Sequence, residues 1–346
     1  MALVPAATPR GCRLAEGEND VTLLLNRAEL ESILDATSVI EAVERGFADF
    51  SSGKIVMPVR TAIRVSDPGG TMLVMPCAMT ETRVLNTKIV SVFGGNPARG
   101  LPTISALCVL LDYQTGATVA VMDAGFITGL RTAAASAVAT KYLAREDART
   151  LGIFGTGVQG YYHAIAIPAV RTIERILVKA SSLEKAQAFA ASLKGKVSAE
   201  IVPTESVEDV AGADIVVTGT TQATPIFSGS LLAAGAHVNN VGSHAIGARE
   251  MDTEAVVRSR FYVDSRDACW AESGDIMIPI QEGAITREHV LGEVGEIVQG
   301  TAPGRTSPAD LTLFKSNGLA FQDAVTAALA VERARAAGVG TEFSFS

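Results

Sequence analysis

The segment "LGIFGTGVQG", residues 151–160, carries the clearest structural signal in this chain. A short apolar run leads into G-x-G-x-x-G, and a helical segment follows. In such a turn Gly155 permits the tight bend, Gly157 admits a pyrophosphate and Gly160 allows close packing of helix on strand. The first amides of the helix supply partial positive charge for the phosphates. The stretch therefore predicts a dinucleotide-binding domain with a Rossmann-type, doubly wound parallel sheet.

The end of the next predicted strand departs from the usual pattern. About twenty residues after the glycine turn, such folds place an Asp or Glu that binds the ribose 2′-hydroxyl and repels a 2′-phosphate. This chain reads "ILVKASS" at residues 176–182, so Lys179, Ser181 and Ser182 stand where the acid is expected. They either hold a 2′-phosphate loosely or form a polar turn that faces water. We expect NAD(H) or NADP(H) as cofactor, favour NAD(H), and include Ser181 among the candidate contacts.

Segments before the glycine turn predict a different architecture. Residues 27–54 carry apolar residues at helical spacing and predict two helices. Short β-rich segments between residues 55 and 123 predict an antiparallel or mixed sheet, with a hairpin turn at Gly116. Residues 124–147 then predict a long Ala-rich helix.

Strands and helices alternate from residue 149 onward, and a final helix is predicted at 316–338. We therefore predict an α/β fold with two domains. The Rossmann-type domain, residues 147–311, is inserted into an α+β domain with a mixed sheet, residues 21–146 plus 312–346. Residues 1–20 are rich in Pro, Gly and charged residues and predict a loosely ordered arm.

The composition excludes several functional classes. The net charge is −8, from 29 basic and 37 acidic residues without a basic cluster, which argues against nucleic-acid binding. No run of about eighteen apolar residues predicts a membrane span, and no signal peptide is recognised. Four scattered cysteines without a C-x-x-C pair favour a reducing compartment, so we expect a cytoplasmic protein. No ligand spacing predicts a metal site.

Three basic residues lie inside otherwise apolar segments: Arg60 in "MPVRTAI", Lys88 in "NTKIVSV" and Arg131 in "TGLRTAA". Burying such charges is costly unless each meets an opposite charge. They are either internal ion pairs and exposed strand ends, or they converge on a carboxylate, which Arg and Lys bind well. The Gly/Pro-rich connection at 93–105 is of the kind that closes over a cofactor or substrate.

Six segments together resemble the ornithine cyclodeaminase/mu-crystallin family. In order and spacing they are "MPVRTAI", "TKIVSVFGGNPARGLPT", "VMDAGFITGLRTAAASAVATKYLA", "LGIFGTGVQG", "HVNNVGSHAIGAREMD" and "TLFKSNGLAFQDAVTAAL". The resemblance runs from about Leu23 to Ala336. It implies a homodimer, and it implies that the mixed-sheet domain binds substrate and forms the dimer.

The resemblance also implies roles for individual residues. Arg60, Lys88 and Arg131 would hold a substrate carboxylate near the nicotinamide, with Arg60 and Lys88 counted among the catalytic residues and Met75 lining the substrate pocket. The residues that resemble the family's cofactor contacts, beyond the glycines already named, are Thr103, Arg131, Thr132, Thr156, Val158, Gln159, Thr220, Gly242 and Asn317.

His244, in "VGSHAIGARE", is the informative departure. The family's cyclodeaminases and alanine dehydrogenases have Asp at this position, and its ketimine reductases have Ser. Reduction of a cyclic imine requires a proton at the imine nitrogen, and a His with an ordinary pKa of about 6.5 can donate it. We therefore predict that His244 is the proton donor, assisted by Ser243. The alternative is that His244 contacts the cofactor ribose or a loop carbonyl.

These inferences predict an NAD(P)H-dependent reductase of small cyclic α-imino acids. The expected reaction converts Δ1-pyrroline-2-carboxylate to L-proline, or acts on the six-membered homologue. Three alternatives stay open: an ornithine cyclodeaminase that recycles NAD, an alanine-dehydrogenase-like or N-alkyl-amino-acid dehydrogenase, and a non-catalytic crystallin-like binding protein. The expected partners are a small imino or amino acid and a second copy of the chain.

Overall fold

The computed structural model describes residues 21–345, so the arm expected at residues 1–20 lies outside the described residues. The chain divides into two compact units. The mixed-sheet unit comprises residues 21–34, 52–128 and 323–345, and the parallel-sheet unit comprises Asp35–Ser51 and Gly129–Gln322. The division falls inside helices α3 (Ala124–Leu143) and α11 (Ala320–Ala337). The domain boundaries expected at 146/147 and 311/312 stay a prediction.

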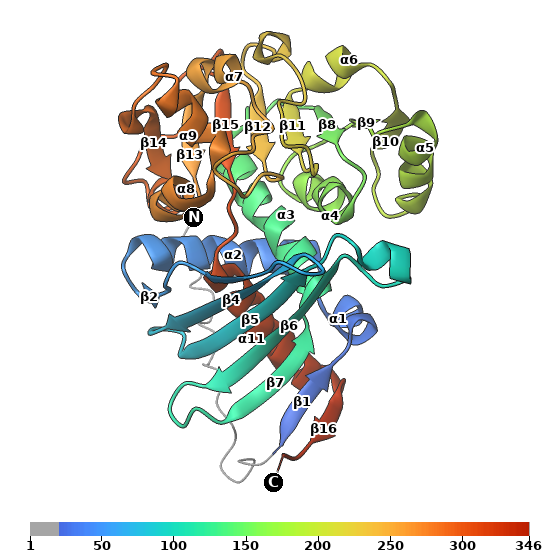
Figure 1. Cartoon of the computed structure of the whole chain (residues 1–346), viewed down its shortest axis with the longest axis vertical. Helices are drawn as coiled ribbons and strands as arrows, with labels where there is room; N and C mark the ends of the chain where they lie inside the picture. Colours follow the sequence, from blue (N-terminus) through green and yellow to red (C-terminus); the bar gives the residue numbers. More distant parts are fainter. Residues whose placement is uncertain (1–20, 346) are drawn as a thin grey trace, which may run out of the picture. The chain divides into compact units, whose positions relative to one another are not determined.

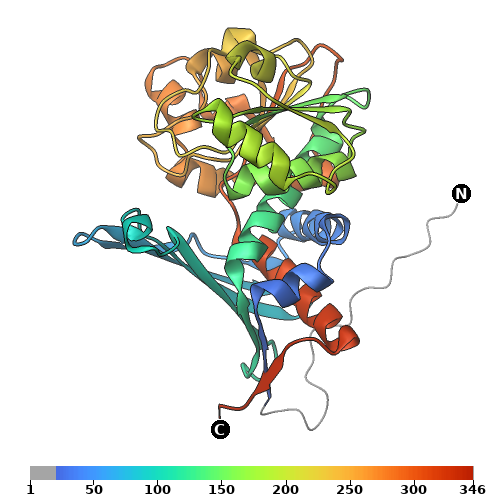
Figure 2. The same ribbon diagram turned by 90° about the vertical axis from the view of Figure 1, so that its right-hand side faces the viewer.

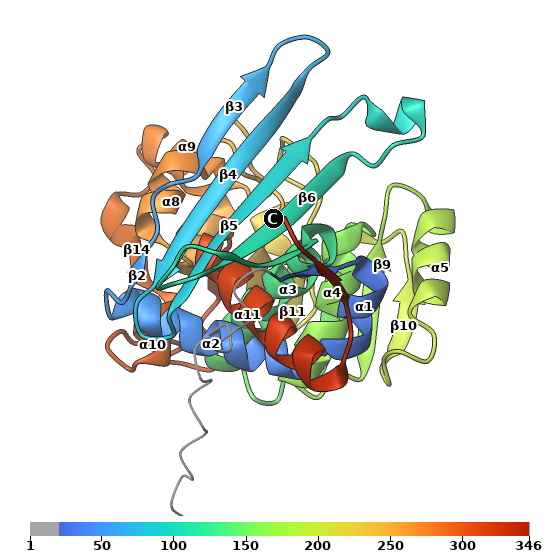
Figure 3. The ribbon, with the colours of Figure 1, turned by 90° about the horizontal axis from the view of Figure 1, so that it is seen from below.

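The mixed sheet has the strand order β16-β1-β7-β6-β5-β4-β2 (Figure 1), and β3 pairs with β4 (Figure 3). Strands β4 to β7 form an antiparallel meander, whereas β1 runs parallel to β7. The bounds are β1 Thr22–Leu25, β2 Ile55–Val56, β3 Thr61–Val65, β4 Gly70–Met79, β5 Val84–Val92, β6 Ile104–Asp112, β7 Thr118–Asp123 and β16 Thr341–Phe343.

The hairpin between β6 and β7 follows from its turn residues. The Asp112 carboxylate accepts hydrogen bonds from the amides of Gln114 and Thr115 at 2.9 and 2.8 Å. Gly116 has φ +73°, a conformation that glycine adopts without strain. The predicted hairpin with Gly116 at positive φ is confirmed.

Side chains alternate between the two faces of the mixed sheet. On β5, Asn86 and Lys88 belong to the buried face, along which helix α11 runs (Figures 2 and 3). On the opposite face, Ile89 of β5 pairs with Leu107 of β6, and these side chains are 40% and 52% exposed. Ile63 of β3 is 50% exposed on the same face. This outer face is therefore apolar and open in the described part of the mixed-sheet unit.

The parallel sheet has the order β10-β9-β8-β11-β12-β15-β13-β14, with every neighbouring pair parallel (Figure 1). The order reverses between β8 and β11, where doubly wound folds bind their ligands at the carboxyl ends of the strands. The bounds are β8 Thr150–Phe154, β9 Arg175–Lys179, β10 Glu200–Pro203, β11 Ile215–Thr218, β12 His237–Asn240, β13 Arg260–Val263, β14 Val290–Glu293 and β15 Thr312–Lys315.

Helices begin mostly at side-chain caps, as with Asn26 before α1 and Ser182 before α5. The remaining α-helices are α1 Arg27–Ile33, α2 Ala36–Ser51, α4 Val158–Ala166, α5 Leu183–Ser192, α6 Val207–Ala211, α7 Thr253–Arg258, α8 Arg266–Glu272, α9 Gly274–Gln281 and α10 Val294–Val298. Short 3-10 helices are η1 Asn96–Arg99, η2 Ile167–Ala169, η3 Gly229–Leu231 and η4 Arg287–His289.

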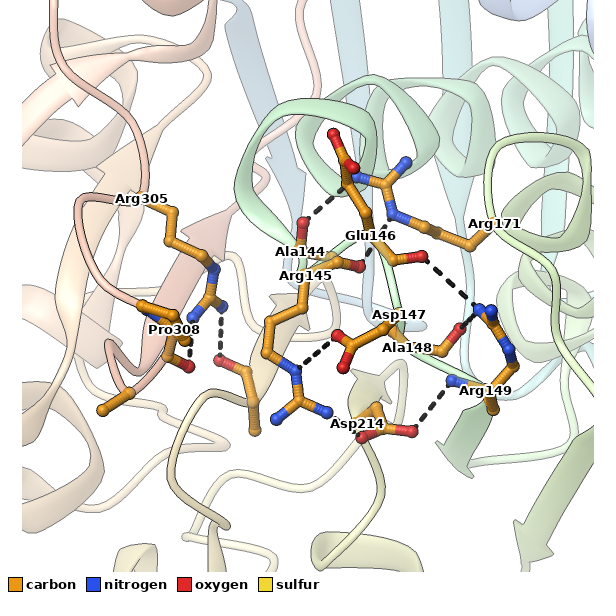
Figure 4. Close-up of polar contacts among 12 residues, drawn as sticks. Ala144, Arg145, Glu146, Asp147, Ala148, Arg149, Arg171, Asp214, Arg305 and Pro308 are labelled. Carbon is orange, nitrogen blue, oxygen red and sulfur yellow. Dashed lines mark hydrogen bonds and ion pairs between the residues drawn. The ribbon is translucent and has the colours of Figure 1, made fainter.

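Two arginines, Arg171 and Arg305, hold the C-terminal end of α3 inside the parallel-sheet unit, and Figure 4 shows Arg171 at the carbonyls of Ala144 and Arg145. Arg171 donates to the carbonyls of Lys141, Ala144 and Arg145 at 2.8, 3.1 and 3.0 Å. Arg305 donates to the Leu143 carbonyl at 2.8 Å. These carbonyls lack partners within the helix, and cations there also meet the negative end of the helix dipole.

The predicted α/β fold class, with a mixed sheet and a Rossmann-type parallel sheet, is confirmed. Two strands of the parallel sheet, β14 and β15, were not recognised from the sequence, and β15 lies between β12 and β13. Across residues 21–345, every helix is too short or too polar to cross a membrane.

Candidate nucleotide-binding and catalytic site

The glycine turn has the backbone geometry that a pyrophosphate site requires. Gly155 has φ +103°, and a Cβ there would lie 2.7 Å from the Gly219 carbonyl oxygen. A Cβ on Gly160 would overlap the Gly155 carbonyl oxygen. A Cβ on Gly157 would meet no protein atom within 4 Å, so the turn is open beside the first residues of α4.

The other predicted contacts of this turn lie at the start of α4. Thr156 and Gln159 are half-buried, and Val158 is 58% exposed. Gly157 caps α4 without a side-chain hydrogen bond, which leaves the first helical amides for a ligand.

The turn after β9 is polar and bears no acid at the position where one was expected. Ser182 caps α5 by accepting from the Lys185 amide at 3.4 Å, and the Lys185 ammonium donates to the Ser181 hydroxyl at 3.0 Å. Ser181 and Ser182 are exposed. Both interpretations of these residues, as a polar turn facing water and as contacts of a 2′-phosphate, stay predictions.

A buried carboxylate ties together the loops after β11 and β12. Glu250 accepts from the amide and hydroxyl of Thr220, each at 2.7 Å, and from the Gly242 amide at 2.8 Å. Burial raises the pKa of Glu250, against the lowering effect of the Thr220 hydrogen bonds. A Cβ on Gly242 would overlap the Glu250 carboxylate, so only glycine fits there. Thr220 and Gly242, predicted as cofactor contacts, are thus held by Glu250.

His244 lies in the loop after β12 and is exposed, whereas Ser243 is 4% exposed. The Ser243 hydroxyl donates to the Ala248 carbonyl at 2.6 Å, so it stabilises the loop. This contact engages the hydroxyl that was predicted to assist His244.

Arg131 and Thr132 lie on α3, and each is 5% exposed. Arg131 donates to the Gln322 side chain at 2.6 Å, and a Cβ on Gly318 would lie 2.8 Å from the Arg131 guanidinium. The backbone amide of Asn317 donates to Asp264 at 2.7 Å. Burial, ahead of opposing hydrogen bonds from Gly318 and Asn317, raises the pKa of Asp264 to about 6.

In the mixed-sheet unit, Lys88 is 1% exposed and lies in a row of buried side chains that crosses the strands. Met75 of β4 pairs with Lys88, and Lys88 pairs with Cys108 of β6. The Lys88 ammonium lies 2.8 Å from the Asp323 carboxylate and 3.4 Å from the Thr128 hydroxyl. Lys88 is therefore ion-paired within this unit, and its role towards a substrate carboxylate stays a prediction.

Arg60 directly precedes Thr61, whose partner in the sheet is Val74. Arg60 therefore lies beside the Met75 end of the row that contains Lys88, and its side chain is half-buried. Thr103 is exposed and directly precedes β6. Its carbonyl accepts from the Phe93 amide at 2.8 Å, a hydrogen bond that joins the two ends of the connection at 93–105.

The remaining histidines have structural environments. His163 is fully buried, its Nδ1 donates to the Gln159 carbonyl at 2.7 Å and its Nε2 accepts from the Ser136 hydroxyl at 2.8 Å. Burial lowers its pKa to about 4. His237 bonds Thr312 at 3.0 Å, and His289 donates to Val256. Among residues 21–345, His, Cys and acidic side chains form no cluster suited to a metal ion.

Sequence reasoning missed four charged residues near these loops or Lys88: Glu250, Asp275, Lys315 and Asp323. Lys315 stands in the apolar run "TLFK", the same signal that singled out Lys88. Nothing local marks the three acids, because their partners are distant in the chain.

The chain is similar to known proteins over nearly its whole length. The model of the ornithine cyclodeaminase/mu-crystallin family matches residues 20–338. A Δ1-pyrroline-2-carboxylate reductase from Bacillus cereus is 36% identical over 328 residues, covering 93% of this chain and 100% of that protein.

Two solved structures are similar in fold and sequence. A Thermococcus litoralis Δ1-pyrroline-2-carboxylate reductase in complex with NADH and L-proline has a TM-score of 0.90 and 43% identity, covering 92% of this chain and 99% of that one. An archaeal alanine dehydrogenase dimer with bound NAD has a TM-score of 0.88 and 31% identity, covering 94% and 100%.

Proposed function

Because this chain belongs to the ornithine cyclodeaminase/mu-crystallin family, we propose that it is an NAD(H)-dependent reductase of a small cyclic α-imino acid. The substrate is Δ1-pyrroline-2-carboxylate, which becomes L-proline, or its six-membered homologue. The observation that carries this proposal is the 43% identity, over 92% of the chain, with a reductase solved with NADH and L-proline. The open glycine turn at the start of α4 fits the dinucleotide.

The reaction adds a hydride to the carbon that bears the carboxylate and a proton to the imine nitrogen. Bound NADH supplies the hydride. We assign His244 as the donor of the proton, because it is an exposed titratable side chain in the loop at the carboxyl end of β12.

The substrate carboxylate needs cationic partners, and we assign Arg60, Lys88 and Arg131 to it. The register of the mixed sheet supports the grouping of Arg60 with Lys88. Buried Lys88, already paired with Asp323, contributes a fixed and oriented ammonium. Holding the substrate carboxylate in place positions the imine carbon for hydride transfer, and such positioning accounts for much of the rate of an enzyme reaction.

The test is to follow NADH and, separately, NADPH oxidation by absorbance, with each cyclic imine supplied in turn. We expect rapid oxidation of NADH. Ammonia release from ornithine without net change in the cofactor would instead establish a cyclodeaminase, and NADH oxidation only with pyruvate and ammonia would establish an alanine-dehydrogenase-like enzyme. NADH binding without any turnover would leave a binding protein.

The His244→Ala variant tests the proton donor. We expect kcat to fall by about 100-fold while NADH still binds. The Arg249→Ala variant, in the same loop, is the control. Imine reduction at the wild-type rate by His244→Ala across pH would remove His244 from the mechanism.

We further propose that the outer face of the mixed sheet pairs with a second copy of the chain. The row of Val74, Ile89 and Leu107 across β4, β5 and β6 is apolar, and exposed apolar surface of this kind marks interfaces. The alanine dehydrogenase that this chain resembles is a dimer.

A cytoplasmic location is also proposed. It rests on the scattered cysteines, since no disulfide joins the three within residues 21–345, Cys77, Cys108 and Cys269.

A further inference from the structure

Lys315 is a fully buried lysine that the proposed reaction does not use. It is the last residue of β15, which lies between β12 and β13 (Figure 1). Its ammonium donates to the Asn240 side chain at 2.7 Å and to the Ser243 carbonyl at 2.6 Å, and it lies 3.1 Å from the Asp275 carboxylate. The ammonium is thus held by two hydrogen bonds and one ion pair.

The partner Asp275 is itself a backbone anchor. One of its oxygens accepts from the amides of Glu250 and Met251 at 2.8 and 2.9 Å and from the Asn240 side chain at 3.1 Å. The Glu250 carboxylate in turn accepts from the amides of Thr220 and Gly242.

The loop from Gly242 to Glu250 is therefore fixed at both ends. Glu250 holds the Gly242 amide and Asp275 holds the Glu250 amide. Its later part packs on the start of α9, where the Gly274 amide donates to the Ala245 carbonyl at 3.1 Å and a Cβ on Gly274 would overlap the Ala248 carbonyl. The contact from Lys315 to Ser243 O falls on the residue directly before His244.

We propose that Lys315 is a positioning residue for imine reduction: by holding the Ser243 carbonyl, it fixes the backbone that carries His244. This inference rests on the proposed role of His244. Lys315 acts through the main-chain oxygen of Ser243, so its effect depends on the geometry of that hydrogen bond.

A double-mutant cycle tests the proposal, using Lys315→Met, His244→Ala and their combination. Methionine keeps an unbranched apolar stem and removes the donors. We expect Lys315→Met to lower kcat by about 10- to 100-fold, because a misplaced group loses its reaction geometry. In the His244→Ala background the same change should alter kcat by less than about 2-fold.

A second readout is independent of turnover. Amide hydrogen exchange in the peptide 243–249 should accelerate in Lys315→Met without cofactor, while exchange in the glycine turn, residues 155–160, stays as in the wild type. If Lys315→Met fails to fold because Asp275 is left without its cation, the Lys315→Met/Asp275→Asn variant removes both charges and is measured instead.

The outcomes separate the two proposals. Wild-type kcat in His244→Ala would overturn both the role of His244 and this inference. A slow His244→Ala enzyme that Lys315→Met slows further by its full factor, or unchanged exchange at 243–249, would overturn this inference alone.

Discussion

The Lys88 ammonium and the Asp323 carboxylate form an ion pair of 2.8 Å whose side chains are 2% and 0% exposed. Burial, and after it the negative charge of Asp323, raises the pKa of Cys77 to about 12. The Lys88 ammonium, which we assign to bind the substrate carboxylate, thus already has a buried counter-charge in Asp323.

Replacing one partner of this pair leaves the other charge buried. We expect Lys88→Met and Asp323→Asn each to lower the free energy of unfolding by about 3–5 kcal/mol. The double variant should lose at least about 2 kcal/mol less than the sum, because it buries neither charge. Denaturant titration of the four proteins measures this coupling, and strictly additive losses would contradict it.

The glycine turn offers a matched pair of substitutions. Gly160→Ala places a Cβ against the Gly155 carbonyl, so it should lower the free energy of unfolding by about 2–3 kcal/mol. It should also weaken NADH binding, because the glycine turn is displaced. Gly157 has φ −82° and open space, so Gly157→Ala should fold as the wild type does and only weaken NADH. Thermal unfolding and NADH titration check both, and equal stability of the two variants would refute the packing argument.

Stability should fall in mild acid because His163 is buried in its neutral form. Its folded pKa is about 4, below the unfolded value of 6.5, so between these values the unfolded chain binds more protons. Its contribution is complete above pH 6.5 and is lost as the pH falls towards 4, in total about 3 kcal/mol.

The control is His163→Gln, which keeps a polar side chain without this titration. Denaturant unfolding at several pH values should give a shallower loss between pH 6.5 and 4 for the variant than for the wild type. Parallel curves would show that His163 does not carry the effect.

The C-terminal cap of α3 predicts a second stability difference. Arg171→Met removes the hydrogen bonds to Lys141, Ala144 and Arg145 and should cost about 2–4 kcal/mol. Arg149, whose side chain is 41% exposed, is the control, and Arg149→Met should cost less than about 1 kcal/mol. Chemical denaturation distinguishes them, and kcat per folded molecule should stay unchanged in both.

The proposed dimer face is open to charge insertion. Ile89→Asp/Leu107→Asp should yield a monomer in sedimentation, because the two carboxylates would be buried in the interface. Leu101→Asp, on a side chain that is 55% exposed in the connection between β5 and β6, is the control and should remain a dimer. A double variant that sediments as the wild type does would place the interface elsewhere.

The glycine turn, the mixed meander and the long α3 could be predicted because their signals are local: glycine spacing, strand alternation and an Ala-rich run. Strand β15 was missed because its four residues follow a long irregular segment and carry a lysine. The hydrogen bond between Glu250 and Thr220 joins residues 30 apart in the chain, and no periodic pattern in the sequence predicts it. The sequence therefore indicated which loops carry chemistry, but not the buried charges that fix them.

The turn after β9 tolerates substitution better than the glycine turn does. Ser181 and Ser182 are exposed, whereas Gly155 and Gly160 are constrained by backbone contacts. If the turn after β9 contacts the cofactor ribose as proposed, we expect substitutions there to change the preference between the two nicotinamide cofactors without loss of the folded state. Cofactor preference and stability of the fold would thus be separable properties of this chain.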